Sequence, residues 1–114
     1  MARSAPYSPA RGDLVWLDFD PQVGHEQSGR RPALVLSGTG YNAQTGLMIV
    51  CPITGRAKGY SSEVPIPAGL PITGVVLCDQ VKCLDWAGRR AVYIGPAPPG
   101  LVVAVLSGVL LAMS

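Results

Sequence analysis

Short apolar runs, separated by glycine, proline and polar residues, make up most of the chain before Gly95. They extend over Leu14–Phe19, Ala33–Ser37 and Leu47–Thr54. Runs of this length that are rich in β-branched and aromatic residues are typical of β-strands. The second and third runs have so few polar positions that they indicate strands buried on both faces. The hydrophobic pattern therefore predicts a mainly β fold.

Three later segments complete the predicted elements. Glu63–Pro67 is typical of an edge strand because its prolines cannot donate backbone hydrogen bonds, and Gly74–Cys83 is the longest predicted strand. Residues 101–113 are almost uniformly apolar, so periodicity does not separate helix from strand there, and length and terminal position favour a helix. We expect roughly five to seven short strands bent into a small β-barrel, with short helices and a C-terminal helix.

Two polar loops interrupt the predicted strands. Pro21–Arg31 concentrates hydrogen-bonding side chains, and Gly55–Tyr60 is basic. Loops of this kind often carry binding and catalytic residues. Asp18 and Asp20 precede the first loop, and we expect them to brace it through arginine or backbone amides rather than to act as an acid–base pair.

Length and composition favour one domain with an apolar contact surface. A chain of 114 residues forms a single domain by the usual size relation. Residues 1–10 are small, polar and proline-containing, which predicts a flexible N-terminal arm before one domain over residues 11–114. Charged residues make up only 14% and hydrophobic residues 48%, whereas soluble domains usually carry about 25% charged residues. Part of the apolar surface is therefore expected to meet a partner.

Cysteine content suggests a cytoplasmic protein, and net charge does not identify its partner. The net charge of +2 is too small to establish nucleic-acid binding. The three cysteines have no C-x-x-C spacing and lie in apolar runs, which predicts reduced, buried thiols. The N-terminus lacks the apolar core of a secretion signal, and residues 101–113 are too short to span a bilayer. No membrane association is expected.

Elimination leaves arginine, hydroxyl and amide chemistry. His25 is the only histidine, no G-x-S-x-G motif is present, and neither metal-ligand spacing nor a phosphate-binding glycine motif occurs. We therefore expect no metal and no cofactor. Guanidinium groups bind phosphate through paired hydrogen bonds and can stabilise the charge of a phosphorane. RNA carries its own nucleophile, the 2′-hydroxyl beside the scissile phosphate, so this set suits RNA cleavage.

Two linked motifs resemble the MazF/PemK family of toxin endoribonucleases. They read Arg11-Gly-Asp-Leu-Val-Trp-Leu-Asp-Phe-Asp-Pro21 and Gly24-His-Glu-Gln-Ser-Gly-Arg-Arg-Pro-Ala-Leu-Val-Leu-Ser37. The likeness continues through Pro52-Ile-Thr54, Lys58-Gly-Tyr60 and Asp79-Gln-Val-Lys82. It implies a small SH3-like barrel of the MazF/PemK/CcdB type that acts as a homodimer on single-stranded RNA without a cofactor. It also implies a MazE-type antitoxin whose acidic, disordered tail covers the RNA site.

The resemblance assigns catalytic roles to Arg31 and Thr54. It implies that Arg31 binds the scissile phosphate, that Thr54 bonds the same phosphate or a reacting oxygen, and that the products are a 2′,3′-cyclic phosphate and a 5′-hydroxyl. The alternative for Arg31 is a surface arginine paired with Asp18 or Asp20. The candidate RNA-binding residues are Glu26, Gln27, Arg30, Arg56, Lys58, Gln80 and Lys82.

Other residues have simpler interpretations. Trp16 and Trp86 are expected in the core or an interface rather than as stacking platforms, and Arg89-Arg90 as a solvated hairpin tip. The helix at 101–113 has no charged residue, so we expect its extra apolar face to enter the homodimer or the antitoxin interface. The rival functions are a CcdB-like inhibitor of DNA gyrase and a catalytically silent RNA-binding module.

Overall fold

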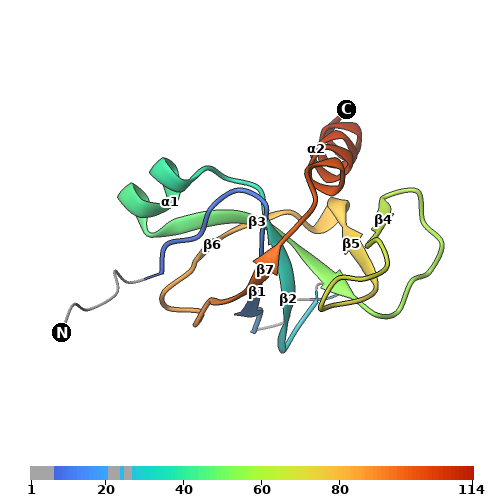
Figure 1. Cartoon of the computed structure of the whole chain (residues 1–114). Coiled ribbons are helices and arrows are strands. Elements are labelled where there is room, and N and C mark those ends of the chain that lie inside the picture. The colour runs from blue at the N-terminus through green and yellow to red at the C-terminus, as the bar shows by residue number, and fades with distance from the viewer. Residues whose placement is uncertain (1–6, 21–23, 25–26) are drawn as a thin grey trace.

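A computed structural model describes residues 7–20, 24 and 27–114 (Figure 1). The chain alternates short strands with tight connections and ends in a long helix. The elements are β1 (Asp13–Asp18), β2 (Arg30–Val35), α1 (Thr39–Thr45), β3 (Leu47–Thr54), β4 (Glu63–Pro65), β5 (Val75–Leu77), a 3₁₀ turn (Cys78–Gln80), β6 (Lys82–Asp85), β7 (Val92–Pro96) and α2 (Pro99–Met113).

The strands form one antiparallel sheet in the order β4-β5-β3-β2-β1-β7. On the side away from β2, strand β3 pairs with two strands. Its first half pairs with β6, and its last two residues pair with β5. No hydrogen-bonded ladder among the described residues joins β7 to β4 or β6, so the sheet is bent but open. The predicted mainly β fold is confirmed, but the sheet is curved without closing into a barrel.

Both faces of the sheet are covered by apolar packing, as the uninterrupted runs in β2 and β3 predicted. One cluster, around Leu34 and Cys51, packs under α2 through Leu101 and Val105. The other cluster lies on the opposite face, and its members are Val15, Leu17, Phe19, Ala33, Val35, Met48 and Val50. Successive strand residues point to opposite faces, so each central strand contributes to both clusters.

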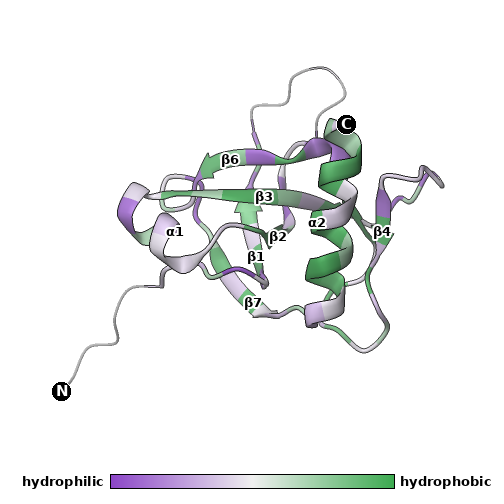
Figure 2. Ribbon diagram, turned by 90° about the horizontal axis from the view of Figure 1, so that it is seen from above, coloured by the Kyte–Doolittle hydropathy of each residue, from purple (hydrophilic) through white to green (hydrophobic). Residues whose placement is uncertain are grey.

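Helix α2 confirms the predicted C-terminal helix and lies across the strands as a largely apolar rod (Figure 2). Gly108 lets it approach the 3₁₀ turn closely, because a Cβ atom there would lie 2.6 Å from the Cys78 sulfur. The opposite side of the helix stays exposed at Val103, Leu110, Leu111 and Met113. In the part of the chain that the structure describes, no helix is long and apolar enough to cross a membrane.

Two details differ from the sequence predictions, and the described end of the expected N-terminal arm makes contacts of its own. Gly74–Cys83 is not one strand, because β5 and β6 pair with opposite ends of β3 and the 3₁₀ turn carries the chain between them. Cys51 and Cys78 are buried as predicted, but Cys83 is exposed. Within the segment expected to be an arm, the Tyr7 hydroxyl donates to Asp13 at 2.6 Å and the Pro9 carbonyl accepts from Asn42.

Candidate active site

Arg31 and Thr54 lie at the ends of neighbouring strands. Strands β2 and β3 pair with Ala33 opposite Pro52, and continuation of this register by two residues brings Arg31 opposite Thr54. Opposite residues of an antiparallel pair point to the same side of the sheet. This register therefore places the two residues, which are distant in the sequence, at adjoining strand ends.

The Arg31 guanidinium is held by a backbone group. Its Nε donates to the Ser28 carbonyl at 2.8 Å, and the residue is half-buried. Across the described residues, no carboxylate forms an ion pair with Arg31, because Asp18 pairs with Arg30 and Arg90 instead. The alternative interpretation, Arg31 paired with Asp18 or Asp20, is therefore wrong for this structure.

Thr54 is fixed by the backbone around it. Its side chain is nearly buried, at 8% exposure, and its hydroxyl accepts from the Arg56 amide at 3.2 Å. Gly74 lies against the Thr54 carbonyl so closely that a Cβ atom at residue 74 would be 2.2 Å from that oxygen, and the φ of Gly74 is +123°. Only glycine fits this position without displacing the end of β3.

An open groove of about 420 Å³ borders the pair, and we refer to it as the Arg31 groove. Thr54 does not line it, although Ile53 and Gly55 on either side of Thr54 do. Its lining residues are Trp16, Arg30, Arg31, Pro32, Ile53, Gly55, Pro71, Ile72 and Thr73. An arginine-bearing groove with apolar walls can accept a phosphate and the flat base next to it.

The basic loop after β3 has an ordered backbone and exposed side chains. The Glu63 carboxylate accepts from the amides of Lys58 and Gly59 at 2.9 to 3.1 Å. Arg56 and Lys58 are exposed. The loop therefore presents two cations from a fixed backbone, which suits contacts to a phosphate chain.

The remaining candidate RNA contacts cluster around the 3₁₀ turn. The Gln80 side-chain oxygen accepts from the Gln27 amide at 3.0 Å, so it ties the turn to the end of the first polar loop. Lys82 begins β6 and its backbone pairs with Val50. Glu26 lies outside the described residues. Gln80 therefore has a structural contact that sequence reasoning did not anticipate.

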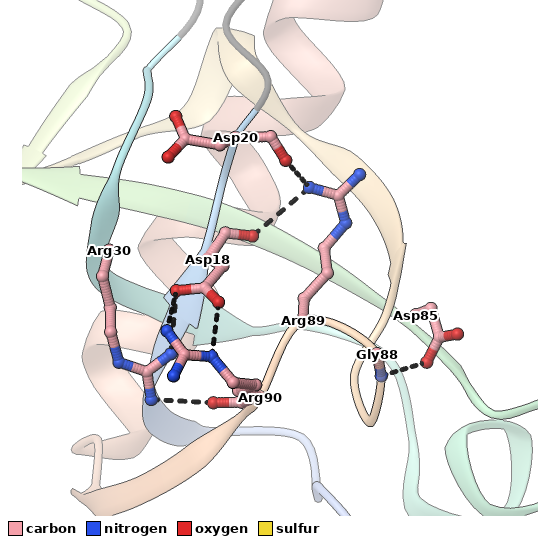
Figure 3. A pocket seen from close by; sticks show the side chains of 7 residues that line it. All are labelled: Asp18, Asp20, Arg30, Asp85, Gly88, Arg89 and Arg90. Atoms are coloured by element: carbon pink, nitrogen blue, oxygen red, sulfur yellow. Dashed lines mark hydrogen bonds and ion pairs between the residues drawn. The ribbon is translucent and has the colours of Figure 1, made fainter.

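A second pocket, of about 620 Å³, is lined almost entirely by charged side chains (Figure 3). At its centre the Asp18 carboxylate accepts from Arg30 at 3.0 Å and from Arg90 at 2.7 and 3.2 Å. These hydrogen bonds, from Arg90 first and then Arg30, lower the pKa of Asp18. We call this set, Asp18 with Arg30 and Arg90, the Asp18 triad.

Further hydrogen bonds fasten the connection between β6 and β7 to the end of β1 and the first polar loop. Arg89 donates to the carbonyl oxygens of Asp18 and Asp20 at 3.3 and 2.8 Å (Figure 3). The Asp20 carboxylate accepts from the Gly29 amide at 2.8 Å. The predicted bracing role of the two aspartates is confirmed. The turn at Arg89-Arg90 is solvated as predicted at Arg90, whose side chain is 70% exposed, but it is not the tip of a hairpin, because β6 pairs with β3 and β7 with β1, and both of its arginines are engaged. Asp18 and Arg90 are 72 residues apart, and no local sequence signal pairs them.

Burial suppresses the nucleophilic form of two thiols. Desolvation raises the pKa of Cys51 to about 12 and also raises the pKa of Cys78, so these thiols stay protonated and unreactive at neutral pH. Within residues 7–20, 24 and 27–114, no cluster of three or more histidine, cysteine or acidic side chains could hold a metal ion.

Comparisons with known proteins agree with these features. Residues 10–113 match the family described as PemK-like, MazF-like toxin of type II toxin–antitoxin system. The Escherichia coli endoribonuclease toxin MazF is 47% identical over 93 residues, covering 82% of this chain and 83% of that protein. The Escherichia coli endoribonuclease PemK is 33% identical over 101 residues, covering 84% and 75%.

Solved structures show the same arrangement. The crystal structure of MazF from Deinococcus radiodurans superposes with a TM-score of 0.92 at 52% identity, covering 95% of this chain and 98% of that chain. A MazE–MazF crystal structure from the same organism gives a TM-score of 0.82 at 49% identity, covering 96% and 100%. The likeness therefore extends over nearly the whole fold.

Proposed function

The chain belongs to the PemK-like, MazF-like family of toxins of type II toxin–antitoxin systems, and from this membership we propose that it is a sequence-selective endoribonuclease. Its substrate is single-stranded RNA or mRNA. The observation that carries the proposal is the placement of Arg31 and Thr54 at adjoining strand ends beside a groove, with no described carboxylate pairing Arg31. A CcdB-like action on gyrase is not favoured, because the similar curated proteins are endoribonucleases.

The chemistry uses a nucleophile that the substrate supplies. The ribose 2′-oxygen attacks the adjacent phosphorus, the bond to the 5′-oxygen breaks, and the proton lost from the 2′-oxygen is balanced by one gained at the 5′-oxygen. Arg31 donates hydrogen bonds to the phosphate as its charge rises. Thr54 orients the same phosphate or a reacting oxygen. The products are a 2′,3′-cyclic phosphate and a 5′-hydroxyl, and no metal or cofactor is required.

The RNA path follows the exposed cations and amides around this pair. The residues assigned to RNA binding are Glu26, Gln27, Arg30, Arg56, Lys58, Gln80 and Lys82. The exposed side chains of the loop after β3 support phosphate contacts for Arg56 and Lys58. Gln80 is assigned a positioning role through Gln27.

We assign two protein partners. A similar Deinococcus radiodurans toxin is known in complex with MazE, which supports a MazE-type antitoxin with an acidic, disordered tail for this chain. The exposed apolar side of α2 supports a homodimer or the antitoxin contact. A monodisperse monomer at micromolar concentration without antitoxin would contradict the homodimer. We place the protein in the cytoplasm, where its RNA substrate is found.

The decisive assay incubates the purified protein with a long single-stranded RNA of varied sequence in EDTA and maps the new ends. We expect cleavage at a short recurrent sequence, with cyclic phosphate and 5′-hydroxyl termini. Arg31→Ala and Thr54→Ala should each abolish most of it. Thr45→Ala is the matched control, since that hydroxyl is exposed and bonds only within α1 and to the next strand. Intact RNA with the wild-type protein would contradict the proposed endoribonuclease activity. Undiminished cleavage by both site variants would contradict the proposed catalytic residues.

A further inference from the structure

Trp16 is exposed in the middle of a central strand. Its neighbours Val15 and Leu17 are fully buried, but Trp16 is on the other face and 39% of its surface is exposed. Trp86, in contrast, is half-buried, packs against an apolar cluster and donates its indole N–H to the Asn42 carbonyl at 2.9 Å. The prediction that both tryptophans belong to the core or an interface therefore holds for Trp86, whereas Trp16 is not a core residue.

Trp16 has an apolar neighbour on each side in the sheet. Pro32 is its register partner on β2, and Val92, which is 52% exposed, is its partner on β7. Large aromatic side chains contribute most when they are buried, so a half-open indole between two apolar neighbours leaves a face available. The same indole lines the Arg31 groove.

The groove also places positive charge next to this indole. Pro32, the register partner of Trp16, lies directly between Arg31 and Ala33 in β2, and Trp16, Arg30 and Arg31 all line the same groove although successive strand residues alternate between the two faces. A π-face beside arginine is the combination by which proteins bind single-stranded nucleic acid, with the base stacked and the phosphate bonded. The groove, at about 420 Å³, has room for a base.

We propose that Trp16 is the stacking platform for the nucleobase adjoining the phosphate that Arg31 binds. This assignment rests on the proposed endoribonuclease function and adds a substrate contact to it. Stacking accepts any base because every base has a π-face. Trp16 therefore contributes affinity for the RNA strand, and the choice of sequence comes from the amide and carboxylate groups of the loops.

The first test measures binding of a short RNA taken from around a mapped cleavage site, with 2′-deoxyribose at the scissile nucleotide so that it is not cut. Trp16→Ala is expected to weaken binding by roughly 5- to 150-fold, the range for loss of one stacked base. Trp16→Phe should recover most of the affinity. Trp86→Phe is the control, and it should bind like wild type. In that variant Trp16 is the only tryptophan, since the chain has two, and its fluorescence should change when RNA binds.

The second test replaces each nucleotide of the same RNA in turn with an abasic one. With the wild-type protein, one position next to the scissile phosphate should lose affinity, and with Trp16→Ala that same loss should disappear. A merely structural role for Trp16 would leave the abasic penalty in place. Because the two changes would remove the same contact, their effects should not add.

The outcomes separate this proposal from the proposed function. Wild-type cleavage together with unchanged RNA affinity in Trp16→Ala would overturn the stacking assignment alone. A change of oligomeric state in Trp16→Ala, with an unaltered abasic penalty, would also overturn it and would assign the platform to contact between two copies of the chain. Absence of both cleavage and RNA binding in the wild-type protein would instead contradict the endoribonuclease function.

Discussion

Arg30 and Arg31 are adjacent in the sequence but lie in opposite electrostatic settings. Arg30 donates to the Asp18 carboxylate and to the Arg90 carbonyl, whereas the bond of Arg31 to a described residue goes to the Ser28 carbonyl. Consecutive strand residues point to opposite faces, so Arg30 lies on the same face as its register partner Asp18, whereas Arg31 lies on the other face with no ion pair to a described carboxylate. Among the described residues, Arg30 is paired with a carboxylate and helps to join β1 to the β6–β7 connection, whereas Arg31 has no described carboxylate partner and is the arginine to which we assign the substrate phosphate.

The largest expected difference between the two arginines is in the rate of RNA cleavage. Arg31→Ala should slow it by about 10² to 10³, the usual cost of removing one transition-state donor. Arg30→Ala should slow it by less than about tenfold, because its guanidinium is already bonded to Asp18. Single-turnover cleavage of one RNA gives both rates, and circular dichroism checks that both variants fold. Equal losses of cleavage rate in the two variants would contradict the proposed difference between Arg30 and Arg31.

The stability of the fold should depend more on the backbone that holds Thr54 than on the side chains of the Asp18 triad. Gly74→Ala places a Cβ atom against the Thr54 carbonyl at a positive φ, and we expect a loss of more than about 1 kcal/mol in the free energy of unfolding. Urea denaturation measures it. Gly40→Ala is the control, since a Cβ atom there meets nothing within 4 Å, and its stability should be unchanged or slightly higher.

Release of Arg30 and Arg90 from Asp18 should strengthen RNA binding at low salt. In Asp18→Asn the two guanidinium groups lose their counter-charge, so affinity for uncleavable RNA should rise a few-fold, and its logarithmic salt dependence should steepen by roughly 0.7 for each added phosphate contact. Asp85→Asn changes the net charge equally, but Asp85 accepts a backbone amide at Gly88 rather than a described guanidinium. Identical salt slopes for the two variants would contradict the neutralising role of Asp18.

The smallest expected effect is on acid stability. Hydrogen bonds from Arg90 and Arg30 lower the pKa of Asp18 in the folded state. A lowered pKa stabilises the fold above the ordinary carboxyl pKa, and that stabilisation is lost as the pH falls through the folded-state value. Wild type should therefore melt above Asp18→Asn at neutral pH, and the difference should shrink as the pH falls below about 4. A difference in melting temperature that does not change with pH would oppose this.

Much of the fold was predictable because its signals are local. The apolar runs of β2 and β3 indicated burial on both faces, and residues 101–113 indicated the helix, since each depends on neighbouring residues alone. The break between β5 and β6 was not predictable, because it follows from which end of β3 each strand pairs with. For the same reason the sequence did not distinguish Cys83, which is exposed, from Cys78, which is buried.

For the site, the amino-acid sequence alone indicated Arg31 and Thr54 as the candidate catalytic residues through the family motifs, and it predicted the bracing role of Asp18 and Asp20. Only the tertiary structure decided that Asp18 pairs with Arg30 and Arg90, and that Trp16 opens into the groove rather than into a core. The physical reason is distance along the chain. Asp18 and Arg90 are 72 residues apart, and contacts at such separations depend on how the strands assemble rather than on any local pattern.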